Sequence, residues 1–191
     1  MNLNEANEYA RKMFSTKWVR WFHESLKPAK TAEEKSANVK LGKITNHCAI
    51  CRNLHGCCFV KDKCPTLPLH RSCHCGPREV KYVEVKADSP KVKFSDYVFV
   101  AKNGKKELFT AWGYDTIDSE DLANIYKEQA ELAYSVGDYV LGKLNEYGQR
   151  ISIEITLTRR DNGKKVTFMS GWMVYPDGEI SLATPYGGKK K

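Results

Sequence analysis

The C-terminal part of the chain alternates between apolar and polar residues and predicts a small antiparallel sheet. Over residues 151–158, isoleucine or leucine occupies every second position and polar residues occupy the others, as in a half-buried strand. The tripeptide at 161–163, Asp-Asn-Gly, is typical of a hairpin turn, so a second strand is expected over 166–175. A further turn at 176–178 leads to a third strand over 179–183. These three strands form the expected meander.

Two helices are predicted ahead of these strands. Residues 106–112 form a short helix, and a longer one begins at Asp118 and ends at Gly137, because glycine readily adopts the left-handed conformation that follows many helices. Apolar residues recur on one side of the longer helix, which would cover one face of the sheet. Residues 80–93 indicate an exposed strand or extended connector. The sequence therefore predicts an α+β fold with a compact C-terminal domain over 94–188.

The N-terminal part has a helical period instead. Its apolar and aromatic residues recur at spacings of three and four, and they are Ala6, Ala10, Met13, Phe14, Trp18, Trp21, Phe22 and Leu26. We expect an amphipathic helix over 4–27, ended by Pro28, with a linker that completes a segment over 1–43. The apolar stripe of this helix either packs against the rest of the chain or docks to a partner protein.

All seven cysteines fall in one short window, which indicates a zinc-binding knuckle over 44–80. A Cys-x-x-Cys pair at Cys48 and Cys51 is followed by His70, Cys73 and Cys75, and zinc takes four such ligands in a tetrahedron. The preferred set is Cys48, Cys51, His70 and Cys73, with Cys75 as the rival for the fourth position. An odd number of cysteines argues against a disulfide framework, although a redox pair or reduced structural thiols remains the alternative.

The zinc is expected to be structural. A catalytic zinc keeps one position open for water beside an acid or base, whereas this window is rich in thiols and its only acid is Asp62. A second metal site is left open by the remaining ligand types in the window, Cys57, Cys58, Cys64 and His74.

The charge of the chain suits nucleic acid but does not require it. The net charge is +8, and lysine or arginine contacts to phosphates release counterions, although scattered lysines also serve solubility. No stretch approaches the ~20 uninterrupted apolar residues of a membrane span, so we expect no membrane partner.

A polar segment over 142–150 carries the candidate catalytic residues. Lys143, Glu146 and Arg150 are the residue types that a metal-independent ribonuclease would use, with Glu146 as base and the two cations holding developing phosphorane charge. Tyr147 and Gln149 accompany them, and the group is expected to face Thr184 and Tyr186. The alternative is a structural turn in which Glu146 pairs with Arg150. No histidine lies beyond His74, which excludes a histidine-dependent mechanism within this domain.

The cysteine window resembles a known family. The segments His47-Cys-Ala-Ile-Cys51-Arg-Asn-Leu-His-Gly56 and Leu67-Pro-Leu-His70-Arg-Ser-Cys73-His-Cys75 are similar to the C-terminal signature of tailed-phage minor head (head morphogenesis) proteins of the Mu and SPP1 type. The resemblance implies that His70, Cys73 and Cys75 form the second ligand cluster of a zinc site. The segments Lys106–Gly113, Gly137–Arg150 and Ser170–Gly178 resemble parts of a domain of unknown function found in such proteins and in polymorphic toxins, and this resemblance spans residues 94–188.

These resemblances imply a virion-associated, zinc-binding phage protein that is structural or contacts DNA. Its partners would be phage head or portal proteins or DNA, and its place the virion or the host cytoplasm. One alternative is an injected toxin-like effector acting on nucleic acid. Another is a phage inhibitor or adaptor that binds a host protein through the N-terminal helix.

Overall fold

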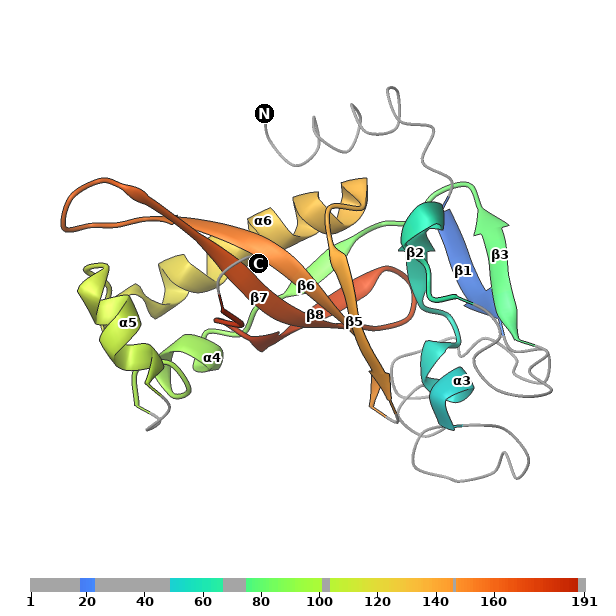
Figure 1. The fold of residues 1–191 in the computed structure, drawn as a ribbon, viewed down its shortest axis with the longest axis horizontal. Coiled ribbons are helices and arrows are strands. Elements are labelled where there is room, and N and C mark those ends of the chain that lie inside the picture. The colour runs from blue at the N-terminus through green and yellow to red at the C-terminus, as the bar shows by residue number, and fades with distance from the viewer. Residues whose placement is uncertain (1–17, 23–48, 67–74, 101–103, 146, 189–191) are drawn as a thin grey trace.

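Two β-sheets and a long helix form the fold. The computed structural model describes residues 18–22, 49–66, 75–100, 104–145 and 147–188. Within these ranges a three-stranded sheet has the order β2-β1-β3, and a five-stranded sheet has the order β4-β8-β7-β6-β5 (Figure 1). The mixed α+β class predicted from the sequence is therefore confirmed.

The smaller sheet is built around β1 (Trp18–Phe22), which pairs antiparallel with β2 (Cys58–Val60) on one side and β3 (Gly76–Val80) on the other. The prediction of a helix over 4–27 is wrong for these five residues, and the rest of that range lies outside the described residues. The segment Trp-Val-Arg-Trp-Phe is rich in β-branched and aromatic residues, which suit a strand. Because two neighbouring strands satisfy its backbone and Trp18 and Trp21 are buried, pairing outweighs the helical spacing of the aromatics.

The larger sheet contains the predicted meander. The three expected strands correspond to β6 (Gly148–Thr158), β7 (Lys165–Val174) and β8 (Glu179–Thr184) and pair antiparallel in that order. Two further strands extend it. β5 (Val140–Asn145) pairs antiparallel with β6, and β4 (Lys86–Asp88) pairs parallel with β8.

The two helices predicted in the C-terminal part are present close to their expected positions, and further short helices were not predicted. The short helices are α3 (Ala49–Leu54), α4 (Val92–Ser95) and α5 (Lys105–Ala111). Two 3-10 turns are η1 (Lys61–Lys63) and η2 (Thr116–Asp118). The long helix α6 (Ser119–Val136) is followed by Gly137 at φ 78°, as predicted. Asp118 occupies the N-cap position but makes no cap bond to α6; its carboxylate instead accepts from the backbone N–H of Asp115 at 2.9 Å.

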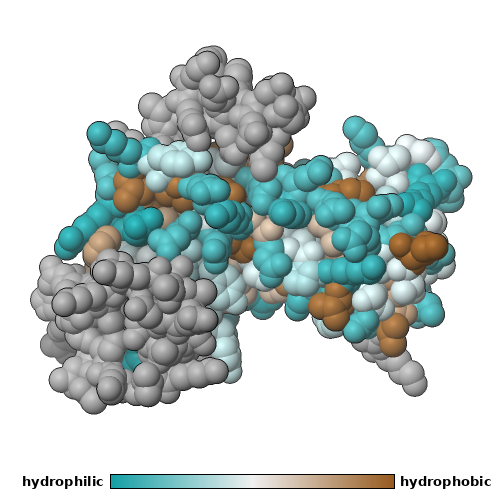
Figure 2. All heavy atoms as spheres, turned by 180° about the vertical axis from the view of Figure 1, so that it is seen from behind, coloured by the Kyte–Doolittle hydropathy of each residue, from teal (hydrophilic) through white to brown (hydrophobic). Residues whose placement is uncertain are grey.

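The core lies between α6 and one face of the larger sheet. Ile151, Ile153, Ile155 and Leu157 are all buried there, as their alternation predicts. Helix α6 contributes Leu122, Tyr126 and Tyr134 among others, and Figure 1 shows it behind the sheet. Seen from that side, the described surface is mostly hydrophilic with small, separate apolar areas (Figure 2).

The two sheets share this core. Tyr134 donates its hydroxyl proton to the carbonyl of Cys58, and the hydroxyl of Tyr139 lies 3.2 Å from both the Val60 nitrogen and the Lys63 carbonyl oxygen. Trp18 also packs edge-on against Tyr134, with ring centroids 5.7 Å apart. The cysteine segment is therefore packed against the C-terminal segment rather than tethered to it by a linker alone.

Candidate metal centre and nucleic-acid interface

Two of the predicted zinc ligands are described, and both are buried. Cys51 lies on α3 and has no exposed surface, and Cys75 directly precedes β3 and is 8 % exposed. Cys48, His70 and Cys73 lie outside the described residues.

The fold brings the segments of Cys51 and Cys75 to the same end of the smaller sheet. In the register of β1 and β3, Phe22 pairs with Gly76, the residue after Cys75. The ring of Phe22 also contacts His55, just beyond α3, at a centroid distance of 5.6 Å. Figure 1 shows α3 beside this end of β1 and β3. The donor chemistry fits a structural zinc, because two cysteine-bearing segments meet at one end of the smaller sheet.

A complete centre would need ligands from the undescribed segments. Within the described ranges, no group of three or more His, Cys, Asp or Glu residues could hold a metal ion. The predicted set takes its remaining ligands from Cys48, His70 and Cys73, so the sequence spacing, not the described geometry, completes it.

The thiols of Cys57 and Cys58 have different hydrogen-bond partners. The thiol of Cys57 donates to the carbonyl oxygen of Val174 at 3.7 Å, whereas that of Cys58 donates to Gly56 at 3.4 Å. Neighbouring residues of an extended segment point to opposite sides. Burial raises the pKa of the Cys64 thiol to about 12, which favours its protonated form. Burial, together with the charges of Tyr139 and of these three cysteines nearby, raises the pKa of the Tyr134 hydroxyl, and the described residues hold no group of three ligands there.

A second site lies on the face of the larger sheet away from α6, called here the open face. Buried positions alternate along each strand with partly or fully exposed ones, and the latter form this face. Its residues are Arg150, Ser152, Glu154 and Thr156 on β6, Met169, Gly171 and Met173 on β7, and Ser181 and Thr184 on β8.

Arg150 and Thr184 meet over a glycine on this face. Gly171 pairs with Ser152 on one side and Thr184 on the other. A Cβ placed on Gly171 would lie 3.7 Å from Nη2 of Arg150 and 3.5 Å from Cγ2 of Thr184. The missing side chain leaves room for the guanidinium to lie across β7 towards β8. The predicted approach of Arg150 to Thr184 is therefore present.

Tyr97 and Lys105 continue this line beyond β8. The ammonium of Lys105 donates to the Tyr97 hydroxyl at 3.2 Å and lies 4.7 Å from its ring centroid. Hydrogen bonds from Lys105 and Thr184, together with the charges of Lys105 and Lys93, lower the pKa of the Tyr97 hydroxyl. We name Arg150, Thr184, Tyr97 and Lys105 the polar row.

The other candidates from the polar segment fall in different places. Lys143 lies exposed on β5, and Glu146 is outside the described residues. Gln149 is buried, and its amide donates to the carbonyl oxygens of Gly142 and Arg150 at 2.9 and 2.6 Å, so its role is structural. Tyr147 is 77 % exposed.

Tyr186 belongs to the core side rather than to the polar row. Its ring lies 5.3 Å from Phe168 and 6.2 Å from Trp112, centroid to centroid. The register shift between Gly171 and Trp172 precedes this change of side. The prediction that Tyr186 faces the polar segment is therefore wrong.

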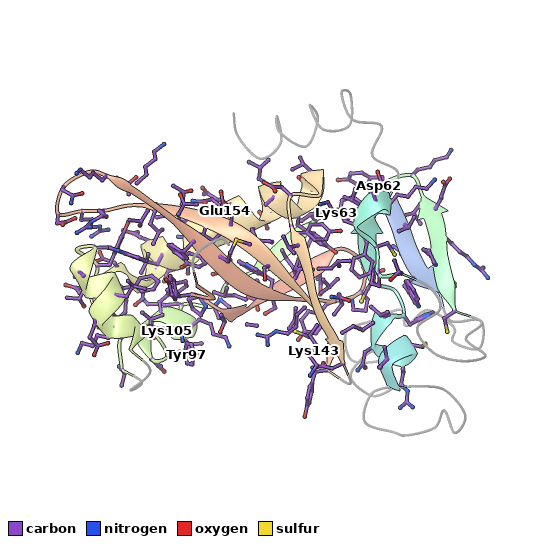
Figure 3. All side chains as sticks on the ribbon, viewed as in Figure 1. Asp62, Lys63, Tyr97, Lys105, Lys143 and Glu154 are labelled. Carbon is purple, nitrogen blue, oxygen red and sulfur yellow. The ribbon has the colours of Figure 1, made fainter. Side chains whose placement is uncertain are left out.

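The sequence reasoning missed Tyr97 and Lys105. They precede the sheet residues of the row by more than 40 positions and belong to no motif, so only the tertiary structure could place them beside Thr184. Figure 3 shows Tyr97 and Lys105 near α4 and α5, Glu154 on β6 and Lys143 on β5, the edge strand opposite β4.

Comparisons with known proteins do not assign this chain to a family. No helix among the described residues is long and apolar enough to cross a membrane. No protein-family model, curated protein or solved structure matches the chain.

Proposed function

We propose that this chain is a zinc-binding, virion-associated protein of a phage head that contacts DNA and stabilises an assembly rather than turning over a small molecule. The observation that carries the proposal is the approach of the Cys51 and Cys75 segments at one end of β1. Cys51 comes from the first cysteine cluster of the phage-type signature and Cys75 from the second. A structural zinc there would join α3, β1 and β3.

The zinc would also fix how the smaller sheet packs on the larger one. The strand β2 follows α3 in the chain, and its residues Cys58 and Val60 contact the hydroxyls of Tyr134 on α6 and of Tyr139. Loss of the metal would therefore loosen a strand that packs against the larger sheet's helix. Structural zinc contributes folding free energy directly, on the order of 10 kcal/mol in isolated fingers. This supports a role in which the metal maintains a rigid body for assembly.

DNA contact is supported by the net charge of +8 and by the exposed cations of the larger sheet. Contacts of this kind are independent of sequence and weaken steeply with salt, because each phosphate contact releases counterions. We expect weak binding whose logarithm falls linearly with the logarithm of salt concentration.

A second candidate function, an injected effector that acts on nucleic acid, is favoured by the polar row. Arg150 and Lys105 are cations suited to hold charge on a phosphorane, and a tyrosine with a lowered pKa lies between Lys105 and Thr184. Glu146, the predicted base, lies outside the described residues. Expression of the chain and of Arg150→Ala in a bacterial host tests this candidate, which requires growth inhibition by the first and not by the second.

The adaptor alternative loses part of its basis. It depended on aromatic residues of an N-terminal helix being available to a host protein, but Trp18 and Trp21 are buried within the smaller sheet and its packing on α6.

Metal analysis and DNA binding test the main proposal together. Protein purified without chelator should contain one zinc ion per chain and should bind mixed-sequence duplex DNA more weakly as salt rises. Absence of zinc in protein that is folded by circular dichroism would overturn the metal part, and salt-independent binding would overturn the DNA part.

A further inference from the structure

We propose that the open face binds single-stranded nucleic acid, with the polar row contacting the phosphate backbone and Tyr147 stacking on a base. The inference rests on the nucleic-acid contact in the proposed function and goes beyond it by naming the surface, the residues and the form of nucleic acid.

The charges on this face are arranged for a polyanion. Arg150 stands at one end of the polar row and Lys105 at the other, with Lys93 close enough to Tyr97 to act on its hydroxyl. Glu154 is also on the open face, two positions along β6 from Ser152 and four from Arg150, so it lies beside the line through Gly171 and Thr184 rather than on it. A phosphate backbone that follows the row would therefore meet cations and hydroxyls first.

The glycine in the floor of the row lets the Arg150 guanidinium lie close to the sheet. Gly171 has no side chain, and its neighbours across the sheet are Ser152 and Thr184. The Tyr97 hydroxyl can donate to a phosphate oxygen, and the guanidinium of Arg150 can bind such oxygens in pairs. Two strand spacings separate β6 from β8, about 10 Å, so the row spans more than one phosphate.

Two exposed tyrosines lie at, or close in sequence to, the ends of the row. Tyr147 is 77 % exposed and lies three positions before Arg150, next to the turn between β5 and β6. Tyr97, at the other end, is 37 % exposed and presents its ring to Lys105. A basic track combined with exposed aromatic rings is how many proteins bind single strands, because every base has a face that can stack.

The shape of the open face excludes insertion into the major groove of a duplex. The major groove of B-form DNA is about 12 Å wide and admits a helix or a two-stranded ribbon. The open face is formed by three central strands of a five-stranded sheet, which cannot enter that groove. Unstacked bases of a single strand can instead lie against the face.

The test uses the full, zinc-loaded chain and fluorescence anisotropy. The probes are a labelled single-stranded DNA, the RNA of the same sequence and the matching DNA duplex, each at the same salt concentration. Single strands should bind at least about fivefold more tightly than the duplex. The comparison of the two single strands then shows whether this face binds DNA or RNA more tightly.

Three variants and one matched control locate the site. Arg150→Gln and Lys105→Gln should each weaken single-strand binding, and together they should reduce the salt slope by about 1.4, the value for two phosphate contacts on a single strand. Tyr147→Ala should weaken it about fivefold or more through lost stacking, and as an exposed substitution it leaves the fold intact. Lys127→Gln removes the same charge from the exposed side of α6 and should change binding less than twofold.

Two results would overturn the inference. Equal losses from Lys127→Gln and Arg150→Gln would mean that binding follows net charge alone, and would leave the proposed DNA contact standing. Tighter binding of the duplex that is insensitive to Tyr147→Ala would likewise leave DNA contact in place but move it away from the open face. If no probe binds, the DNA part of the proposed function fails as well, while the zinc measurement still stands by itself.

Discussion

Arg20 and Asp177 form an ion pair that joins the two sheets, with Nη2 and Oδ1 3.3 Å apart. Arg20 lies on β1 and Asp177 in the turn between β7 and β8. Asp177 also donates its backbone N–H to the carbonyl of Gly56 at 3.0 Å, and the neighbouring Pro176 bridges to Cys57. Among the described residues, Asp177 is the one non-glycine residue with a positive φ, 62°. This turn is therefore a contact point between the cysteine segment and the C-terminal sheet.

Substitutions at Asp177 should separate charge from backbone conformation. Asp177→Asn removes the ion pair but tolerates the left-handed conformation, and both partners are partly exposed, so we expect a loss of at most about 1 kcal/mol in the free energy of unfolding. Asp177→Ala adds a strain of about 1–2 kcal/mol. Urea denaturation of both variants measures the difference; equal losses would show that strain plays no part.

Loss of the first cysteine pair should release zinc and destabilise the smaller sheet. Cys48→Ser combined with Cys51→Ser removes two thiolates, and the binding energy of structural zinc is also folding energy. We expect the zinc content to fall to background and the midpoint temperature of thermal unfolding to decrease. Cys64→Ser is the control, because Cys64 lies outside the predicted ligand set; it should retain its zinc. Full zinc content in the double variant would contradict the predicted ligands.

The boundary of the C-terminal domain should lie before β4 rather than after it. The predicted domain begins at residue 94, but Ala87 on β4 donates its backbone N–H to the buried Glu131 carboxylate at 3.0 Å, and β4 covers the edge of β8. A fragment of residues 82–188 should melt cooperatively in EDTA. A fragment of residues 94–188 should melt at least about 5 °C lower, because a buried carboxylate loses its donor.

Both fragments lack residues 49–66, so the loss of partners for Tyr134 and Tyr139 is common to them. Equal melting temperatures would place the boundary at 94 as first predicted. Loss of a cooperative transition in both would show that the cysteine segment completes the core.

Lys105 should control the titration of Tyr97. Its hydrogen bond and charge help to lower the pKa of the Tyr97 hydroxyl, so Lys105→Met should raise that pKa and delay tyrosinate formation to higher pH. The lowered pKa favours the folded state only once tyrosinate forms, so its contribution is complete above the unfolded pKa and disappears as pH falls through the folded one. Ultraviolet difference titration measures the shift, with Lys106→Met as control; equal shifts in both would refute a specific contact.

Local sequence patterns predicted an element correctly wherever the burial of one of its faces determined its structure. The alternation over 151–158 placed β6 correctly because one face of the strand is buried and the other is exposed. Gly137 marked the end of α6 because the chain there needs a positive φ, and a Cβ at that position would lie 3.1 Å from Val60. Fold class and the cysteine-rich motif were accessible for the same reason: both are encoded by residues close together in sequence.

Long-range pairing determined the rest. Trp18–Phe22 has a helical spacing of aromatics, yet it is a strand because β2 and β3, contributed by distant segments, satisfy both of its edges. Tyr97 and Lys105 join Arg150 and Thr184 only because the turn after β4 brings α4 to the end of β8. The spacing of apolar residues along a chain indicates the period of one element, but it does not indicate which other element lies beside it. The sequence alone therefore determined the meander, the two C-terminal helices and the metal ligands to expect, whereas only the tertiary structure decided the strand β1 and assembled the polar row.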